Sequence, residues 1–485
     1  IPYVIAVSST AALGAAKTGA YMCALKKSVV DLVNSLSIQL NETSIINFND
    51  MANVQAHFKI LASWSDDDVK IKGDSINFAK NDADSWIYAG SAASLNGVGE
   101  ANNTIKPVTV DPQNGLTQGL VQNDGFMKRA RKTSYGLSND EIAKYADLAK
   151  VQASRKSYLN VVSTTLQYYY IMASVPLTCL HDIFEKMPLI RNPYFKITLQ
   201  VHTGTVKLTY THAGTKTTIN SISSSYGYIP FMTSKTTEGW VGTADATITI
   251  KSGIGKVTDF SPASDSGWDS TCYFNACLYE MDTDYERKYL TEMGSKLVVY
   301  NDVYSNTLLN AGKTINWQIH TGISKIRGLL VVAQLASVVN TLATPSTAAS
   351  SGYSIAHSPY TSGECMLGLS WQNLNVRVGN IPHYMENVNY DFQMFMNEIR
   401  SFYSVNGGLS SGVSSGLISQ QDFESGVYGY VFIDLSRKNA LEDSVPKTVN
   451  FVATLNSIAT SVDLRAYILY ENSFSINTNT SQISL

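Results

Sequence analysis

Alternation of apolar and polar residues, which is typical of β-strands with one buried face, recurs along most of the chain. In the segment Phe195–His202, Phe, Ile, Leu and Val alternate with Lys, Thr, Gln and His. The segment Val462–Leu469 near the end of the chain has the same period. Leu329–Ala333 is apolar throughout, as in a central strand covered on both faces. The pattern therefore predicts a protein built mainly of strands.

Helical patterns are few. Ser138–Glu141 has the spacing of a capping box, and an apolar stripe follows over 142–149. Apolar residues also recur at helical spacing over Tyr390–Tyr403, which predicts a helix with one buried face. A shorter helix is expected over Leu180–Lys186, ending before Pro188.

The length of 485 residues suits two large β domains of about 200–250 residues each. Ser221–Ser266 is rich in Ser, Thr and Gly, which predicts a long loop or the exit from a domain. Strand-like sequence restarts at Thr271–Phe274. We therefore place a first domain, with an N-terminal arm and loop insertions, at 1–268 and a second at 269–485.

The composition indicates a folded protein with a surface poor in charge. Hydrophobic residues make up 44% and charged residues 15%, against a usual charged share of about 25%. With 36 basic and 39 acidic residues, the net charge of −3 argues against nucleic-acid binding through bulk charge and against disorder. Such a surface is suited to burial against copies or partners.

Two further features concern the compartment and the start of the chain. The five cysteines are odd in number and scattered, which indicates reduced thiols made inside a cell. Ile1–Ala20 is apolar but lacks a basic leader and is too short to span a bilayer, so we expect an arm or first strand.

Enzyme-like motifs occur only in unsuitable settings. The pattern G-x-S-x-G occurs at Gly408–Gly412 and Gly412–Gly416, but a nucleophile elbow needs a strand before the serine and a helix after it. The seven histidines form neither H-x-H nor H-E-x-x-H. We therefore predict no catalytic residue, no cofactor-binding residue and no metal ligand.

Two charged clusters also have structural interpretations. Asp66–Asp68 lacks the spacing of a calcium loop and is expected to form a solvated turn after Phe58–Trp64. Lys128–Lys132 is short and isolated, so a solvated loop or a contact with an acidic neighbour is favoured over nucleic-acid binding.

A series of segments resembles the double jelly-roll major capsid proteins of polinton-like viruses and virophages, which share their architecture with adenovirus hexon. The order and spacing of the set carry this resemblance. Its members are Val29–Phe48 with Met51–Trp64, read as a strand pair, then Val54–Leu61, His181–Leu189 leading into Tyr194–Leu199, Asn387–Phe402, Asn406–Gly408, Gly412, Gly416–Ser419, Tyr430–Arg437 and the tail Thr460–Ile476.

The resemblance implies an all-β fold of two tandem eight-stranded jelly rolls with short helical inserts. Three chains would form a pseudo-hexameric capsomer of an icosahedral virion shell. The chain would be synthesised inside a host cell and located in the virion. Partners would be the chain itself and the penton and minor capsid proteins, without specific nucleic-acid binding or cofactors; an internal membrane is left open. The family supplies no catalytic site.

Two other functions stay open at the level of the sequence. A carbohydrate-binding or adhesive β-sandwich would need exposed aromatic platforms, for which Tyr168–Tyr170 or Trp240 are candidates. A β-barrel enzyme is disfavoured by the histidine spacing and by the setting of G-x-S-x-G.

Overall fold

The fold is seen in a computed structural model of the chain. It describes residues 1–10, 23–48, 50–82, 86–87, 100–101, 123–134, 159–163, 165–191, 193–213, 216–233, 246–255, 272–292, 294–320, 322–336, 359, 361–365, 369–379, 381–402, 416–436, 445–456, 461–477, 480 and 482–484.

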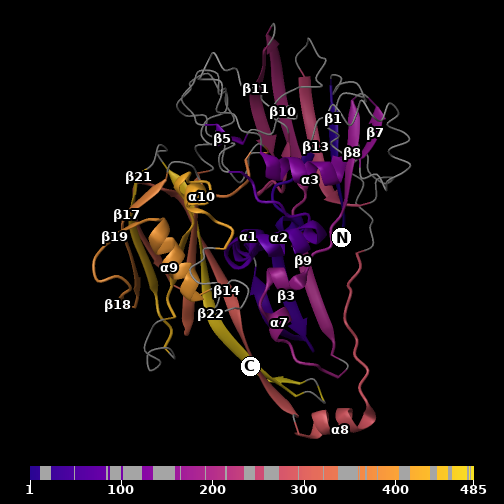
Figure 1. Ribbon diagram of the computed structural model, residues 1–485, viewed down its shortest axis with the longest axis vertical. Coiled ribbons are helices and arrows are strands. Elements are labelled where there is room, and N and C mark those ends of the chain that lie inside the picture. Colours follow the sequence, from indigo (N-terminus) through magenta and orange to yellow (C-terminus); the bar gives the residue numbers. More distant parts are fainter. Residues whose placement is uncertain are drawn as a thin grey trace.

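The second half contains two antiparallel sheets (Figure 1). The first has the order β14 (Ser295–Ala311), β22 (Val462–Asn477), β16 (Ile326–Leu335) and β20 (Val431–Asp434), with β23 (Ile483–Ser484) beside β22. The second has the order β15 (Thr314–Ile319), β21 (Val449–Asn456), β17 (Ser370–Val378) and β18 (Ile381–Pro382), with β19 (Val388–Tyr390) also on β17.

The strand pairs of the second half are nested. The first long strand pairs with the last, β14 with β22, and the next pairs inside them are β15 with β21, β16 with β20, and β17 with β18 and β19. Further pairs, β16 with β22 and β17 with β21, gather these strands into two sheets. A long hairpin rolled up in this way is a jelly roll.

Among its described residues, the first half contains a six-stranded, a three-stranded and two two-stranded sheets. The six-stranded sheet has the order β11 (Lys216–Ser224), β10 (Gly204–Ala213), β13 (Ala246–Ile254), β1 (Pro2–Ser9), β8 (Leu166–Met172) and β7 (Leu159–Ser163). The others are β4 (Thr43–Phe48), β3 (Val33–Leu40) and β9 (Phe195–Val201), then β12 (Phe231–Thr233) with β2 (Cys23–Leu25), and β5 (Trp86–Ile87) with β6 (Glu100–Ala101).

Nested pairing also organises the first half. β1 pairs with β13, β2 with β12, and β3 with β9, so that early strands again meet late ones in reverse order. The prediction of an all-β protein of the jelly-roll type is confirmed.

Helices occur at the connections between strands. They are η1 (Val29–Leu32), α1 (Ala52–Ser63), α2 (Asp66–Lys72), η2 (Gly73–Ile76), α3 (Asp124–Ser134), α6 (Leu177–Leu180), α7 (Ile183–Lys186), α8 (Thr283–Glu292), α9 (Phe392–Phe402) and α10 (Gln420–Glu424). Figure 1 shows α1 at the centre of the molecule, between the strands of the two halves. Its Phe58 ring stacks on Phe432 of β20, with centroids 5.6 Å apart, and one apolar core continues through both halves.

Several predicted elements are confirmed. Phe195–His202 forms β9, Leu329–Ala333 lies in the central strand β16, and Val462–Leu469 opens β22. The helix expected over Tyr390–Tyr403 is α9, and the one expected over Leu180–Lys186 is the short pair α6 and α7. Within the described residues, no helix is both long and apolar enough to cross a bilayer.

Other predictions were wrong. Only Val33–Phe48 forms the expected strand pair, because Met51–Trp64 contains helix α1, whose residues are buried on nearly every side and so show no clear stripe. Ser221–Ser266 is not one loop, since it contains β12, β13 and the end of β11. Of Thr271–Phe274, residues 272–274 pair with no described strand. The helix expected at 138–149 and the boundary near 268 lie outside the described residues.

Candidate functional site: a buried ionic cluster between the halves

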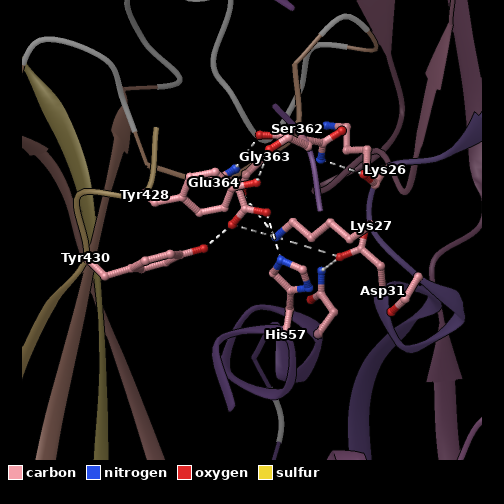
Figure 2. Close-up of polar contacts among 12 residues, drawn as sticks. Lys26, Lys27, Asp31, His57, Ser362, Gly363, Glu364, Tyr428 and Tyr430 are labelled. Carbon is pink, nitrogen blue, oxygen red and sulfur yellow. Dashed lines mark hydrogen bonds and ion pairs between the residues drawn. The ribbon is translucent and has the colours of Figure 1, made fainter. Parts of the chain in front are cut away.

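Five ionisable side chains from both halves meet in the interior, where their side chains are almost wholly inaccessible to solvent. We call Lys26, Lys27, Asp31, His57 and Glu364 the ionic cluster. The first four belong to the first half, and Glu364 arrives from the second. Figure 2 shows Glu364 directed toward His57 and Lys27, with Tyr430 on its other side.

Local structure places the four residues of the first half. The Ser28 hydroxyl accepts a hydrogen bond from the Val30 amide at the start of η1, the usual role of an N-cap serine. The short helix that follows brings Asp31 to within 4.0 Å of the Lys27 ammonium, four residues earlier. Helix α1 contributes His57.

Glu364 lies in the segment 361–365, which is attached to its own half by backbone contacts. The Cys365 amide donates to the Val427 carbonyl at 2.9 Å, and the Gln334 amide donates to the Gly363 carbonyl at 3.1 Å. Gly363 has a φ of +71°, and a Cβ atom there would lie 2.7 Å from the Tyr228 hydroxyl. Only glycine is tolerated at a contact this close.

Glu364 is the central anion of the cluster. Its Oε1 lies 2.8 Å from His57 Nε2 and its Oε2 lies 3.5 Å from Lys27 Nζ, while the Tyr430 hydroxyl donates to Oε2. Burial alone would raise the pKa of this carboxyl, but His57 and Lys27 outweigh burial and lower the pKa to about 2. Burial lowers the pKa of His57, and the neighbouring Glu364 opposes that change.

Asp31 is the second anion. It accepts hydrogen bonds from the Tyr228 hydroxyl at 2.9 Å and from the Asn53 amide at 3.0 Å. Burial raises the pKa of Asp31, and the neighbouring Lys27 opposes that rise. The two carboxylates therefore flank one ammonium group, an arrangement that compensates buried charge.

The remaining cations are held by the first half. Burial lowers the pKa of Lys26 to about 7, and its Nζ lies 5.0 Å from the centroid of the Tyr228 ring. Arg129 is fully buried in α3 and donates to the Leu25 carbonyl at 2.8 Å; burial lowers its pKa to about 10. The expectation of a solvated loop at Lys128–Lys132 was wrong, because this segment is helical and Arg129 ties it to β2.

Polar contacts beyond the cluster also cross between the halves. Lys80 forms an ion pair with Asp422 at 2.6 Å, and the Tyr428 hydroxyl donates to the Asn81 carbonyl at 2.7 Å. His181 of the first half lies 3.3 Å from Asp302 of β14. Because these groups are buried or partly buried and already paired, the arrangement is suited to fixing the two halves at one angle rather than to receiving a substrate.

The motifs that the sequence analysis considered for chemistry do not contribute to the ionic cluster. Residues 408–415 of the G-x-S-x-G matches lie outside the described residues, and Gly416 has a packing role: a Cβ atom there would lie 2.2 Å from the Leu61 carbonyl. Asp66–Asp68 forms the first turn of α2, capped by Ser65; Asp66 and Asp67 are solvated as expected, but the segment is helical. Among the described residues, no group of three or more His, Cys, Asp or Glu is placed to hold a metal ion.

The remaining candidates also have structural places. His57 and His202 are buried, His181 and His383 lie beside Asp302 and Glu398, and His320 is exposed. Tyr168 and Tyr169 are buried in the six-stranded sheet, so they are not the exposed platform that an adhesive protein needs. Trp240 and His357 lie outside the described residues. All five cysteines are free thiols.

Sequence reasoning missed the ionic cluster itself. A signal was present, since Lys26 and Lys27 interrupt an apolar stretch between Cys23 and Leu32. Charged residues in such a stretch are stable in a core only when they are paired. The partner Glu364 is so distant in sequence that no local pattern connects it to them.

The buried histidines predict a loss of stability in acid. Burial lowers the pKa of His202 to about 3 in the folded chain, against about 6.5 when unfolded. As the pH falls below about 6.5, the unfolded chain therefore binds the proton first and is favoured, by about 2 to 3 kcal/mol at roughly pH 4.5. The free energy of unfolding of the His202→Gln variant, measured with urea, should decrease less with falling pH than that of the parent. The exposed His320→Gln should show the same dependence on pH as the parent. Equal slopes for parent and His202→Gln would contradict the assignment.

No family model matches the chain, and no curated protein sequence matches it. Similar solved structures are a chain in the cryo-EM structure of the Sputnik virophage (12% identity, 100% of this chain and 81% of that chain, TM-score 0.43), the mavirus major capsid protein (10%, 100% and 83%, 0.39) and the Faustovirus major capsid protein (10%, 97% and 77%, 0.38). At these TM-scores the likeness carries no argument of its own, and the fold rests on the nested strand pairs. This chain is similar, over nearly its whole length, to these solved structures.

Proposed function

We propose that this chain is a major capsid protein that assembles as homotrimeric capsomers into an icosahedral virion shell. The observation that carries the proposal is the tandem arrangement of two nested-hairpin rolls, fixed to each other by a shared core and the ionic cluster. Three copies of a rigid unit of two jelly rolls would form a pseudo-hexameric capsomer. Its function is mechanical, without catalysis.

The surface supports self-assembly. Only 15% of the residues are charged, and large apolar side chains such as Tyr273, Phe274 and Leu278 are exposed. Apolar groups gathered at a surface mark places where other chains bind. In a closed shell each contact is repeated by symmetry, so that modest contacts suffice.

The domain boundary and the further partners are parts of the same proposal. We place the first jelly roll at 1–268 and the second at 269–485, because nested pairing begins anew at β14. Penton and minor capsid proteins are the further partners that we propose, and the virion is the location.

Purified protein tests this function. We expect a trimer of three times the 52.9 kDa chain mass, about 159 kDa, by light scattering, and hexagonal particles or shells by negative-stain microscopy. A chain that stays monomeric at high concentration and gives no such particles would overturn the proposal. The rival adhesive function would instead show binding on a glycan array.

A further inference from the structure

A stretch of chain between the two halves carries apolar side chains that no described residue covers. We call residues 272–282 the connector, which leads into α8 (Figure 1). Every residue from 272 to 280 is exposed, including Tyr273 at 78% and Leu278 at 94%. No hydrogen bond joins 272–281 to any described residue. An extended apolar segment with unpaired backbone groups is costly to leave in water and open to a partner.

The connector has the sequence of a strand. Residues 272–279 read Cys-Tyr-Phe-Asn-Ala-Cys-Leu-Tyr and contain no charged residue. Aromatic residues favour strands, and the absence of Pro and Gly leaves every backbone amide able to donate. The far end is anchored, because the Tyr289 hydroxyl of α8 donates to the Leu189 carbonyl at 3.0 Å. The connector is therefore a strand-forming segment that lacks a sheet.

A free sheet edge is present in the same chain. Among the described strands, β9 pairs only with β3, so its other edge is open. The His202 amide donates to the Leu32 carbonyl, and the Tyr194 carbonyl accepts from the Asn41 amide, just beyond the two ends of β3. The backbone N–H and C=O groups of even-numbered β9 residues therefore face β3. The backbone groups of Phe195, Ile197 and Leu199 therefore face outward and lack a strand partner.

The side chains of β9 suit an apolar strand. The row of odd-numbered residues, Phe195 to Val201, packs on the core yet stays only half-buried at this edge. The other face carries exposed Lys196, Thr198 and Gln200. A strand laid on this edge would cover the apolar row, and Lys196 offers a cation to Glu280, the acidic residue that follows the uncharged stretch.

We propose that the connector of one copy of this chain adds as a strand to the β9 edge of a second copy. This inference rests on the proposed function, which supplies the neighbouring copies, and it names the surfaces through which they bind. Within one chain both surfaces are present and remain unpaired, so a second copy is the occupant to which we commit. Main-chain hydrogen bonds would give affinity, and the apolar row would give specificity.

Cross-linking between marked copies tests the proposal. The donor copy keeps the exposed Cys272 and Cys277, and the acceptor copy carries Cys272→Ser, Cys277→Ser and Thr198→Cys. Cys179→Ser is made in both, because that thiol is partly exposed. Since Cys272 and Cys277 are five residues apart, their side chains lie on opposite faces of a strand. Whichever face of the connector is on the same side of the sheet as the side chain of residue 198, one of the two cysteines therefore lies on that face.

The matched control acceptor carries Gln318→Cys in place of Thr198→Cys. Gln318 is exposed on β15, an edge strand of the second half. After co-assembly and treatment with a short bismaleimide, we expect a donor–acceptor product of twice the chain mass with Thr198→Cys and none with Gln318→Cys. Leu278→Asp in the donor should lower the yield about tenfold, the effect of a loss of about 1.4 kcal/mol in binding.

The outcomes separate this inference from the function. Trimers or shells without the Thr198→Cys product would overturn the connector proposal and leave the capsid function standing. A single chain carrying Cys277 and Thr198→Cys that links only within itself would show that the connector pairs with its own β9, which also overturns the proposal. A chain that remains monomeric would overturn both.

Discussion

The Glu364→Gln variant should lose about 3–5 kcal/mol of its free energy of unfolding. The substitution keeps the size of the side chain but removes the carboxylate that faces Lys27 at 3.5 Å and His57 at 2.8 Å. Lys27 would then rely on Asp31 alone, at 4.0 Å, for charge compensation in a site without water access. Urea unfolding at pH 7, followed by circular dichroism, measures the loss.

Two further variants make this test specific. Glu286→Gln breaks the exposed contact of Glu286 with Arg191, at 3.9 Å, and should cost about 0–1 kcal/mol. Adding Lys27→Met to Glu364→Gln removes the uncompensated ammonium and should restore part of the stability. If Glu364→Gln costs no more than Glu286→Gln, the ionic cluster does not hold the halves together.

Phe395→Asp should abolish soluble protein. Phe395 of α9 is fully buried. The centroid of its ring lies 5.0 Å from that of Phe423 in α10. An aspartate there would place a charge without a partner in an apolar core. The free-energy cost of this exceeds the small net stability of an ordinary domain. The measurement is the soluble fraction after expression, with circular dichroism of whatever remains soluble.

Two positions of the same helix serve as controls. Gln393→Asp introduces the same side chain at an exposed site and should leave the soluble fraction unchanged. Phe392 is only half-buried, so Phe392→Asp should reduce soluble protein less than Phe395→Asp. Normal yields of Phe395→Asp would show that the apolar stripe of α9 does not face the core.

The fold was predictable where periodicity is local. The start of β22 was predicted from alternation, although most of its residues are buried on both faces. Alternation also predicted β9, and the apolar stripe predicted α9, because in each of these the less accessible residues lie on one face and the exposed residues on the other. Helix α1 was missed for the opposite reason: ten of its twelve residues are buried, so its apolar and polar residues, Asn53 and His57 among them, follow no simple period. Its helical state is set by both halves packing around it.

The site was beyond local pattern. Lys27 and Glu364 are joined only by the packing of the two halves, and nothing in the residues around either predicts the other. For the connector, a strand was expected from Thr271–Phe274, but residues 272–274 pair with no described strand, and the sequence does not say where a partner would lie. Register and partner are decided by tertiary contacts, which composition does not encode.

The nested order of strands has a consequence for biosynthesis. Gly363, whose carbonyl accepts from the Lys27 ammonium, follows that lysine by 336 residues. At about 5–20 residues per second, a ribosome needs roughly 20 to 70 seconds to add that length. During this interval the emerging chain holds two lysines without their late acidic partner. We expect the region around them to stay open to proteases on the ribosome and to close only when translation is nearly finished, so that premature termination products are degraded rather than incorporated into particles.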